Sequence, residues 1–264
     1  MKNFKRYILI IAISFLTFLT ACNFLGEKSD GIIRFAITFP SDNYQPSAIP
    51  QGTDRFSIFV QQVDYPETDP KYVEVSGEPG ETKEVEIEIG AGNYKVAVFA
   101  TKTLTLPSDS SINSILAAGI SNQLEVIPNQ VTEVSVVLEE IIWSDLVYPS
   151  EVLKDTVYTF SVSMNRVFIE SRIGNSFICA QAYDEEGLEI PNGFISEYFL
   201  EDSGPVYEVN LRMPNVDATG TVKTYFKFGN APFGYNLAAE YFVSPIMEST
   251  LVEESGTGII VIIQ

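Results

Sequence analysis

The sequence predicts an all-β protein, with two tandem antiparallel β-sandwich domains after an N-terminal signal segment. Three observations predict this fold. Apolar and polar residues alternate through much of the chain, as they do in strands that keep one face in water. Glycine, proline and asparagine interrupt the alternating runs at short intervals, as turns require. The alternation pauses at residues 141–149, and the two halves it separates are each large enough for a core.

The first half shows the alternation most clearly. Residues 84–89, EVEIEI, alternate glutamate with valine or isoleucine, and the GAGN turn follows before a second run starts at Tyr94. Residues 33–39 and 56–60 are also predicted to be strands. One segment differs: Ser111 to Ala118 follows a proline and ends at a glycine, which favours a short helix.

The segments EVEIEIGAGNYKVAVFA and LEVIPNQVTEVSVVLE resemble the transthyretin-like and immunoglobulin-like sandwiches, among them the regulatory-like domain of carboxypeptidases and collagen-adhesin repeats. The residues that carry the resemblance are Gly92, Tyr94, Val96, Val98, Val126, Val134, Val136 and Leu138. The resemblance implies a fold and no activity. Tyr94 also resembles a tyrosine corner, in which the hydroxyl returns to the backbone.

The second half repeats this order of segments, which suggests a tandem pair. In the first half EVEIEI is followed by NYKVAVF, and in the second half YEVNLRM is followed by TVKTYFKF. Phe177 to Tyr183 is predicted to be a strand, and residues 184–187, DEEG, form the turn of a hairpin. The chain ends in GIIVIIQ, an apolar run typical of a central strand.

The first residues have the features of a secretory signal. Three basic residues precede an uncharged stretch from Tyr7 to Leu19, which is shorter than the ~20 residues of a membrane span. The next residues complete Leu19-Thr20-Ala21-Cys22, which resembles the lipobox of bacterial lipoproteins. That resemblance implies a lipid on the sulfur of Cys22, cleavage before it and acylation of the new amine. An ordinary cleaved signal and an uncut signal anchor are the alternatives.

The predicted organisation has four parts. They are a lipoprotein signal peptide (1–21), a lipidated tether (22–30), the first β-sandwich domain (31–140) and the second (141–264). Asn23 rather than aspartate follows the lipobox cysteine, and in lipoproteins this implies the outer membrane or cell surface rather than the inner membrane.

Composition limits the partners. The chain has 16 Lys+Arg against 35 Asp+Glu, a net charge of −19, and removal of the signal segment would remove only positive charges. Nucleic acid is excluded as a partner, because binding to it depends on basic contacts with phosphates. The expected partners are the membrane, through the N-terminal lipid, and a protein or glycan that the sequence does not identify.

The chain contains no histidine. Its absence excludes Ser-His-Asp and Cys-His catalysis and the common zinc sites, so we expect no catalytic residue, cofactor or metal. Asp202-Ser203-Gly204 matches one aspartic protease triplet, but that chemistry needs two, so a turn is predicted. The acidic loops at 64–69 and 184–186 lack the spacing of a calcium loop. Cys179 lies in a predicted strand and is expected to fill a core.

Four aromatic residues are candidate ligand contacts: Trp143, Phe233, Tyr235 and Tyr241. Trp143 either packs between the domains or offers a platform for a sugar. The other three belong to the loop from Asn230 to Tyr241 and either fold inward or bind a ligand. The sequence therefore predicts a lipid-anchored envelope protein that serves as a non-catalytic binding, adhesion or structural module. Alternatives are a carbohydrate-capturing or fimbrillin-like surface lipoprotein and a carboxylate-based hydrolase.

Overall fold

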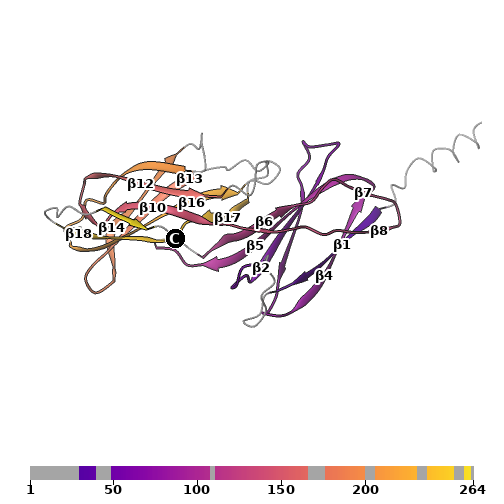
Figure 1. The fold of residues 1–264 in the computed structure, drawn as a ribbon, viewed down its shortest axis with the longest axis horizontal. Coiled ribbons are helices and arrows are strands. Elements are labelled where there is room, and N and C mark those ends of the chain that lie inside the picture. Colours follow the sequence, from indigo (N-terminus) through magenta and orange to yellow (C-terminus); the bar gives the residue numbers. More distant parts are fainter. Residues whose placement is uncertain are drawn as a thin grey trace, which may run out of the picture.

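The computed structural model describes residues 30–39, 49–107, 111–165, 176–199, 206–230, 237–252 and 259–262. Every helix or strand assigned within these ranges is a β-strand, which confirms the all-β prediction. The ribbon is elongated, with the strands of the first half at one end and those of the second half at the other (Figure 1). Within the same ranges there is no helix of the length and hydropathy needed to cross a membrane.

The strands follow one another through both halves. Those of the first half are β1 (Asp30–Thr38), β2 (Arg55–Gln62), β3 (Lys71–Ser76), β4 (Thr82–Gly90), β5 (Gly92–Leu104), β6 (Ile112–Ile120), β7 (Leu124–Val126), β8 (Val131–Glu133) and β9 (Glu139–Glu140). Those of the second half are β10 (Trp143–Pro149), β11 (Glu151–Leu153), β12 (Val157–Met164), β13 (Ser176–Tyr183), β14 (Glu189–Phe199), β15 (Val206–Arg212), β16 (Gly220–Asn230), β17 (Leu237–Val243), β18 (Met247–Val252) and β19 (Ile259–Ile262).

The first half has two layers. A sheet in the order β4-β1-β8 covers one face of β2, β5 and β6, and a single apolar cluster joins the layers. The alternation in β4 explains this arrangement, because Val85 and Ile87 are buried in the cluster while the glutamates between them face water. Tyr94 donates a hydrogen bond from its hydroxyl to the carbonyl of Gly90 at 2.8 Å, which confirms the tyrosine corner.

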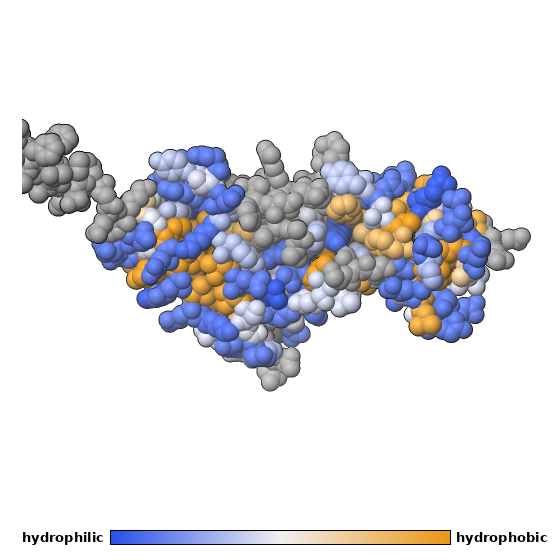
Figure 2. All heavy atoms as spheres, turned by 180° about the vertical axis from the view of Figure 1, so that it is seen from behind, coloured by the Kyte–Doolittle hydropathy of each residue, from blue (hydrophilic) through white to orange (hydrophobic). Residues whose placement is uncertain are grey.

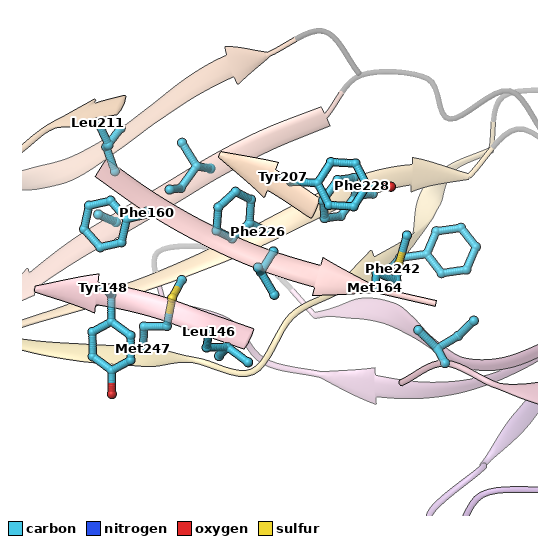
Figure 3. Packing of buried hydrophobic residues seen from close by; sticks show 14 of the residues in the cluster. Leu146, Tyr148, Phe160, Met164, Tyr207, Leu211, Phe226, Phe228, Phe242 and Met247 are labelled. Carbon is cyan, nitrogen blue, oxygen red and sulfur yellow. The ribbon is translucent and has the colours of Figure 1, made fainter. Parts of the chain in front are cut away.

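The second half is also layered. A sheet in the order β15-β12-β10-β19 packs against strands that include β13 and β16. Figure 3 shows the aromatic side chains between the layers, with Tyr207 and Phe228 side by side and Phe226 next along β16. The ring centroids of Tyr207 and Phe228 are 4.5 Å apart. Phe226 and Phe228 are fully buried, so alternate residues of β16 point into this core.

The hairpin between β13 and β14 turns at the predicted place. The amide of Asp184 donates to the carbonyl of Leu188 at 2.9 Å, and the amide of Gly187 donates to the carbonyl of Asp184 at 3.0 Å. Gly187 has a φ of 79°, a left-handed conformation that glycine adopts without steric cost. The DEEG prediction is confirmed.

One large sheet passes through both halves. β17 pairs with β6 in parallel, with Glu240 opposite Asn113 and Tyr241 opposite Ser114, and this pairing makes β6 and β17 part of one 12-stranded sheet. Phe59 and Phe99 of the first half belong to the same apolar cluster as Phe226 of the second. Independent folding of residues 31–140 and 144–264 stays a prediction, which thermal melts of the two separately expressed pieces would test.

A buried carboxylate lies where the halves meet. Glu240 of β17 is 1% exposed and accepts a hydrogen bond from the hydroxyl of Ser57 on β2. The hydroxyl of Tyr72 lies 3.4 Å from the Ser57 oxygen and donates to Glu74 at 3.0 Å. Burial, together with the nearby charges of Glu240 and Glu74, raises the pKa of Tyr72 to about 12.

Two expectations were wrong. Ser111 to Ala118 is not helical: residues 112–120 form β6, which pairs with β5 on one side and with β9 and β17 on the other. The second concerns GIIVIIQ, which was expected in a central strand. Its described part, β19, pairs with β10 at the end of the sheet order β15-β12-β10-β19.

Candidate functional site

Aromatic side chains line the outer face of the sheet in the second half. We call Phe177, Tyr198, Lys227 and Tyr241 the aromatic face. Phe177 on β13 lies in register between Tyr198 on β14 and Lys227 on β16. Tyr241 on β17 lies opposite Gly229, two residues along β16 from Lys227. The four side chains therefore come from four neighbouring strands.

The period of a β-strand determines which way these side chains point. Phe226 and Phe228 point into the core, so Lys227 between them points to the opposite face. Cross-strand partners share a face, which places Phe177 and Tyr198 on the outer side with Lys227. Ile178 is fully buried in the same core cluster as Phe226, in agreement with this assignment.

The rings of the aromatic face contact one another. The centroids of Phe177 and Tyr198 are 5.7 Å apart with an interplanar angle of 69°, an edge-to-face arrangement. The Lys227 Nζ atom lies 4.3 Å from the centroid of the Tyr241 ring, within the range of a cation–π interaction. Tyr198 is 50% exposed and the other three residues are half-buried. Tyr198 therefore offers the most accessible ring of the four.

A buried cluster adjoins this face on the same side of the sheet. Cys179, Tyr225 and Val243 belong to one apolar cluster with Leu106 and Ile112 of the first half, and Phe177 and Tyr241 pack against it. Tyr225 is fully buried and donates a hydrogen bond from its hydroxyl to the carbonyl of Pro107 at 3.2 Å. Cys179 is 4% exposed, which confirms that it fills a core. The β5–β6 connection of the first half thus holds one end of the aromatic face.

The structure separates the aromatic residues that the sequence proposed as ligand contacts. Tyr241 belongs to the aromatic face. Trp143 on β10 packs against the core, with its ring centroid 5.7 Å from that of Phe228, and so lies on the opposite side of β16. Phe233 and Tyr235 lie outside the described residues, as does Cys22.

A groove opens in the side of the first half. It has a volume of about 520 Å³ and lies between β1 and the extended segment 134–138 that follows β8. Its lining is mostly apolar, and the one carboxylate in it, Glu133, is paired with Arg34 at 3.1 Å. Glycoside hydrolysis needs two carboxyl groups across a cleft, so this groove lacks the residues for that reaction.

Within the described ranges, no group of three or more Cys, Asp or Glu side chains is placed to hold a metal ion. The acidic turn at 184–186 instead uses Asp184 to accept hydrogen bonds from the amides of Glu186 and Leu188, at 3.1 and 2.8 Å. This carboxylate closes a turn.

Sequence reasoning missed three members of the aromatic face: Lys227 and the two rings of the β13–β14 hairpin, Phe177 and Tyr198. The sequence held a signal for the two rings. Phe177 lies in the alternating segment SFICAQAY and Tyr198 in GFISEYF, and these segments are the two strands of one hairpin. Pairing the strands outward from the DEEG turn would not have brought the two rings into register, because the register shifts after the turn: Tyr183 pairs with Glu189, whereas Gln181 pairs with Phe194. Lys227 and Tyr241 depend on pairing with β16 and β17, which the hairpin alone does not determine.

Comparison with known proteins gives weak similarities. No protein-family model matches the sequence, and no curated protein matches it. A solved DUF3823 family protein from Bacteroides ovatus has a TM-score of 0.32 and 13% identity over 84% of this chain and 100% of its own. A candidate carbohydrate-binding protein from Bacteroides uniformis has a TM-score of 0.31 and 12% identity, with coverages of 84% and 100%.

A third solved structure is the fimbrial anchor protein Mfa2 from Porphyromonas gingivalis. It has a TM-score of 0.29 and 10% identity over 82% of this chain and 97% of its own. Similarities of this size do not carry a function from one protein to another. What this chain does has to be argued from its own residues.

Proposed function

We propose that this chain is a lipid-anchored protein of the bacterial cell envelope that binds a glycan and does not convert it. The observation that carries the proposal is the aromatic face. In it, half-exposed Tyr198 is followed across neighbouring strands by Phe177, Lys227 and Tyr241. The lipobox-like residues before Cys22 support the anchor, and the groove of the first half, which has one carboxylate in its lining, lacks the pair that glycoside hydrolysis needs.

The chemistry of the face suits a sugar. An exposed tyrosine ring presents an apolar surface to the C–H groups of a pyranose and a hydroxyl to its polar groups. Lys227 supplies N–H donors at the centre of the row, where a sugar hydroxyl or carboxylate would accept them. Buried Tyr225 and Cys179 lie on the same side of the sheet, and Phe177 and Tyr241 pack against their cluster, so these two rings are held in place before a ligand binds.

A glycan screen with the chain from Glu27 onward tests this proposal, because that chain contains every described residue. We expect at least one glycan to be retained. We expect Tyr198→Ala to weaken its binding about tenfold, which corresponds to ~1.4 kcal/mol. Tyr65→Ala is the matched control, since Tyr65 is 52% exposed in the first half and lies outside the aromatic face. Isothermal titration would measure both variants.

Two results would contradict the proposal. If the wild-type chain retained no glycan, the proposal of glycan binding would be wrong. Equal weakening by Tyr198→Ala and Tyr65→Ala would show that the aromatic face is not the site. Unchanged melting temperatures of both variants would establish that neither substitution acts through stability.

The anchor makes a separate prediction. We expect Cys22→Ala to move the protein from the detergent phase to the aqueous phase in a Triton X-114 partition, because the thiol that would take the diacylglycerol is gone. Stable anchoring needs two or three acyl chains, at ~0.8 kcal/mol for each buried methylene. A Cys22→Ser variant should behave in the same way. Detergent partitioning of the mutant after the signal is cut would disprove lipid attachment at Cys22.

A further inference from the structure

The edge of β1 changes its surroundings midway along the strand. From Ile32 to Arg34 it pairs in parallel with β8, where the amide of Ile32 donates to the carbonyl of Gln130 at 2.9 Å. The last bond of this pairing runs from the amide of Val134 to the carbonyl of Arg34 at 3.0 Å. The following segment then leaves β1, and Glu139 pairs with Ala118 on β6. Beyond Arg34, β1 therefore borders the groove.

Hydrogen-bond directions alternate along β1. Phe39 donates its amide to the carbonyl of Glu81 at 2.8 Å, so odd-numbered residues direct their main-chain groups toward the β4 side. Ile32 and Arg34 direct theirs toward β8, and the next even residues, Ala36 and Thr38, face the same way. In the described part of the chain neither residue has a main-chain hydrogen bond on that side. Two consecutive positions of a β-ladder are thus open along the groove.

The floor of the groove is apolar. Phe35 and Ile37 of β1 and Phe56 of β2 line it, with Val134 and Val136 along the opposite wall. All three floor residues are less than 10% exposed, so the groove leads to the core of the first half. The face drawn in Figure 2 shows a broad apolar area with hydrophilic borders on this same half.

We propose that the groove takes an extended segment of a partner protein, which adds to β1 as a strand. Such a segment would pair its backbone with Ala36 and Thr38 and place alternate apolar side chains on the floor. A compact apolar ligand would leave those main-chain groups unpaired. Glu84, opposite Ala36 in register, is exposed, whereas Glu133 on the far side of the groove is already paired with Arg34, and the chain as a whole carries a net charge of −19. The partner segment therefore carries basic residues at its ends.

The test uses the chain from Glu27 onward and a labelled peptide, acetyl-Lys-Val-Thr-Val-Thr-Val-Lys-amide, in a fluorescence polarisation titration. We expect binding that weakens as salt increases. A peptide with proline at the central valine and at both threonines should not bind, because it lacks N–H groups toward β1 whichever way it runs. Ala36→Pro should weaken binding about tenfold by removing one donor, whereas Ala36→Val, which keeps that donor, should bind as well as wild type.

Glu84→Lys provides a variant that does not touch the backbone. This exposed side chain should be replaced without loss of stability, and binding of the basic peptide should weaken together with its salt dependence. Equal binding of the valine and proline peptides would overturn the proposal, as would the absence of binding. Self-association of the chain that Ala36→Pro abolishes, without peptide binding, would assign the groove to a second copy instead. None of these results depends on the aromatic face, which belongs to the other half.

Discussion

Phe228→Ala is expected to lower the free energy of unfolding by about 3–5 kcal/mol, the usual cost of removing a buried phenylalanine ring. Phe228 is fully buried and its ring contacts four others. The centroid distances are 4.5 Å to Tyr207, 5.6 Å to Phe199, 5.7 Å to Trp143 and 6.1 Å to Phe226. The neighbours come from β10, β14, β15 and β16 itself, so no single strand can move to close the cavity.

Urea unfolding followed by tryptophan fluorescence measures this effect directly. Trp143 is the one tryptophan in the sequence and its ring lies against Phe228, so the signal comes from the affected core. Phe194→Ala is the matched control: Phe194 is 41% exposed on β14, and its loss should change stability by less than about 1 kcal/mol. Equal effects of the two substitutions would mean that the ring cluster is not a tightly packed core.

Gly220→Ala is expected to destabilise the second half by about 2–5 kcal/mol through strain and overpacking together. Gly220 begins β16 with a φ of 151°, and a Cβ there would lie 2.0 Å from the carbonyl oxygen of Tyr183. That oxygen belongs to the main chain, so no side-chain rotation relieves the contact. The strand or the neighbouring hairpin turn has to shift.

Gly187→Ala separates the two causes. Gly187 has a φ of 79°, and a Cβ placed on it meets nothing within 4 Å. It should cost only the conformational strain of a left-handed alanine, about 1–2 kcal/mol. Thermal melts of both variants give the comparison. A loss at Gly220 no larger than the loss at Gly187 would contradict the close approach between β16 and Tyr183.

The sequence predicted the features that depend on neighbouring residues. The alternation in EVEIEI, the DEEG turn and the tyrosine corner of Tyr94 are all confirmed. Each involves residues within a few positions of one another, so local periodicity and turn chemistry determine it. The all-β fold follows from the sum of such local patterns.

The wrong expectations depended on contacts between distant segments. Serine, leucine and alanine at residues 111–118 are compatible with a helix, but β5 and β17 pair with this segment from both sides and make it a strand. An apolar run such as GIIVIIQ predicts that both faces of a strand are covered. It does not predict how many neighbouring strands pair with that strand. β19 is therefore apolar and still at the end of its sheet.

The aromatic face was predicted in part for the same reason. In the sequence, Tyr241 ends an aromatic loop, whereas Trp143 is a candidate through its residue type and its place at the predicted boundary. Residue type could not show that Trp143 points toward Phe228, on the far side of the sheet from Tyr241. Which face a ring occupies depends on the register of β10 and β16, and these strands have no short connection.

The parallel contact between β6 and β17 has a mechanical consequence. If the N-terminus is held at a membrane and a ligand pulls on the aromatic face, the tension crosses from the second half to the first through the covalent chain between β9 and β10 and, alongside it, through this contact. The backbone pairing there involves Glu240 with Asn113 and Tyr241 with Ser114. The hydrogen bond between Ser57 and Glu240 and the shared cluster around Phe59 and Phe99 lie beside it. Those side chains, more than the short ladder, resist separation of the two ends of the molecule under load.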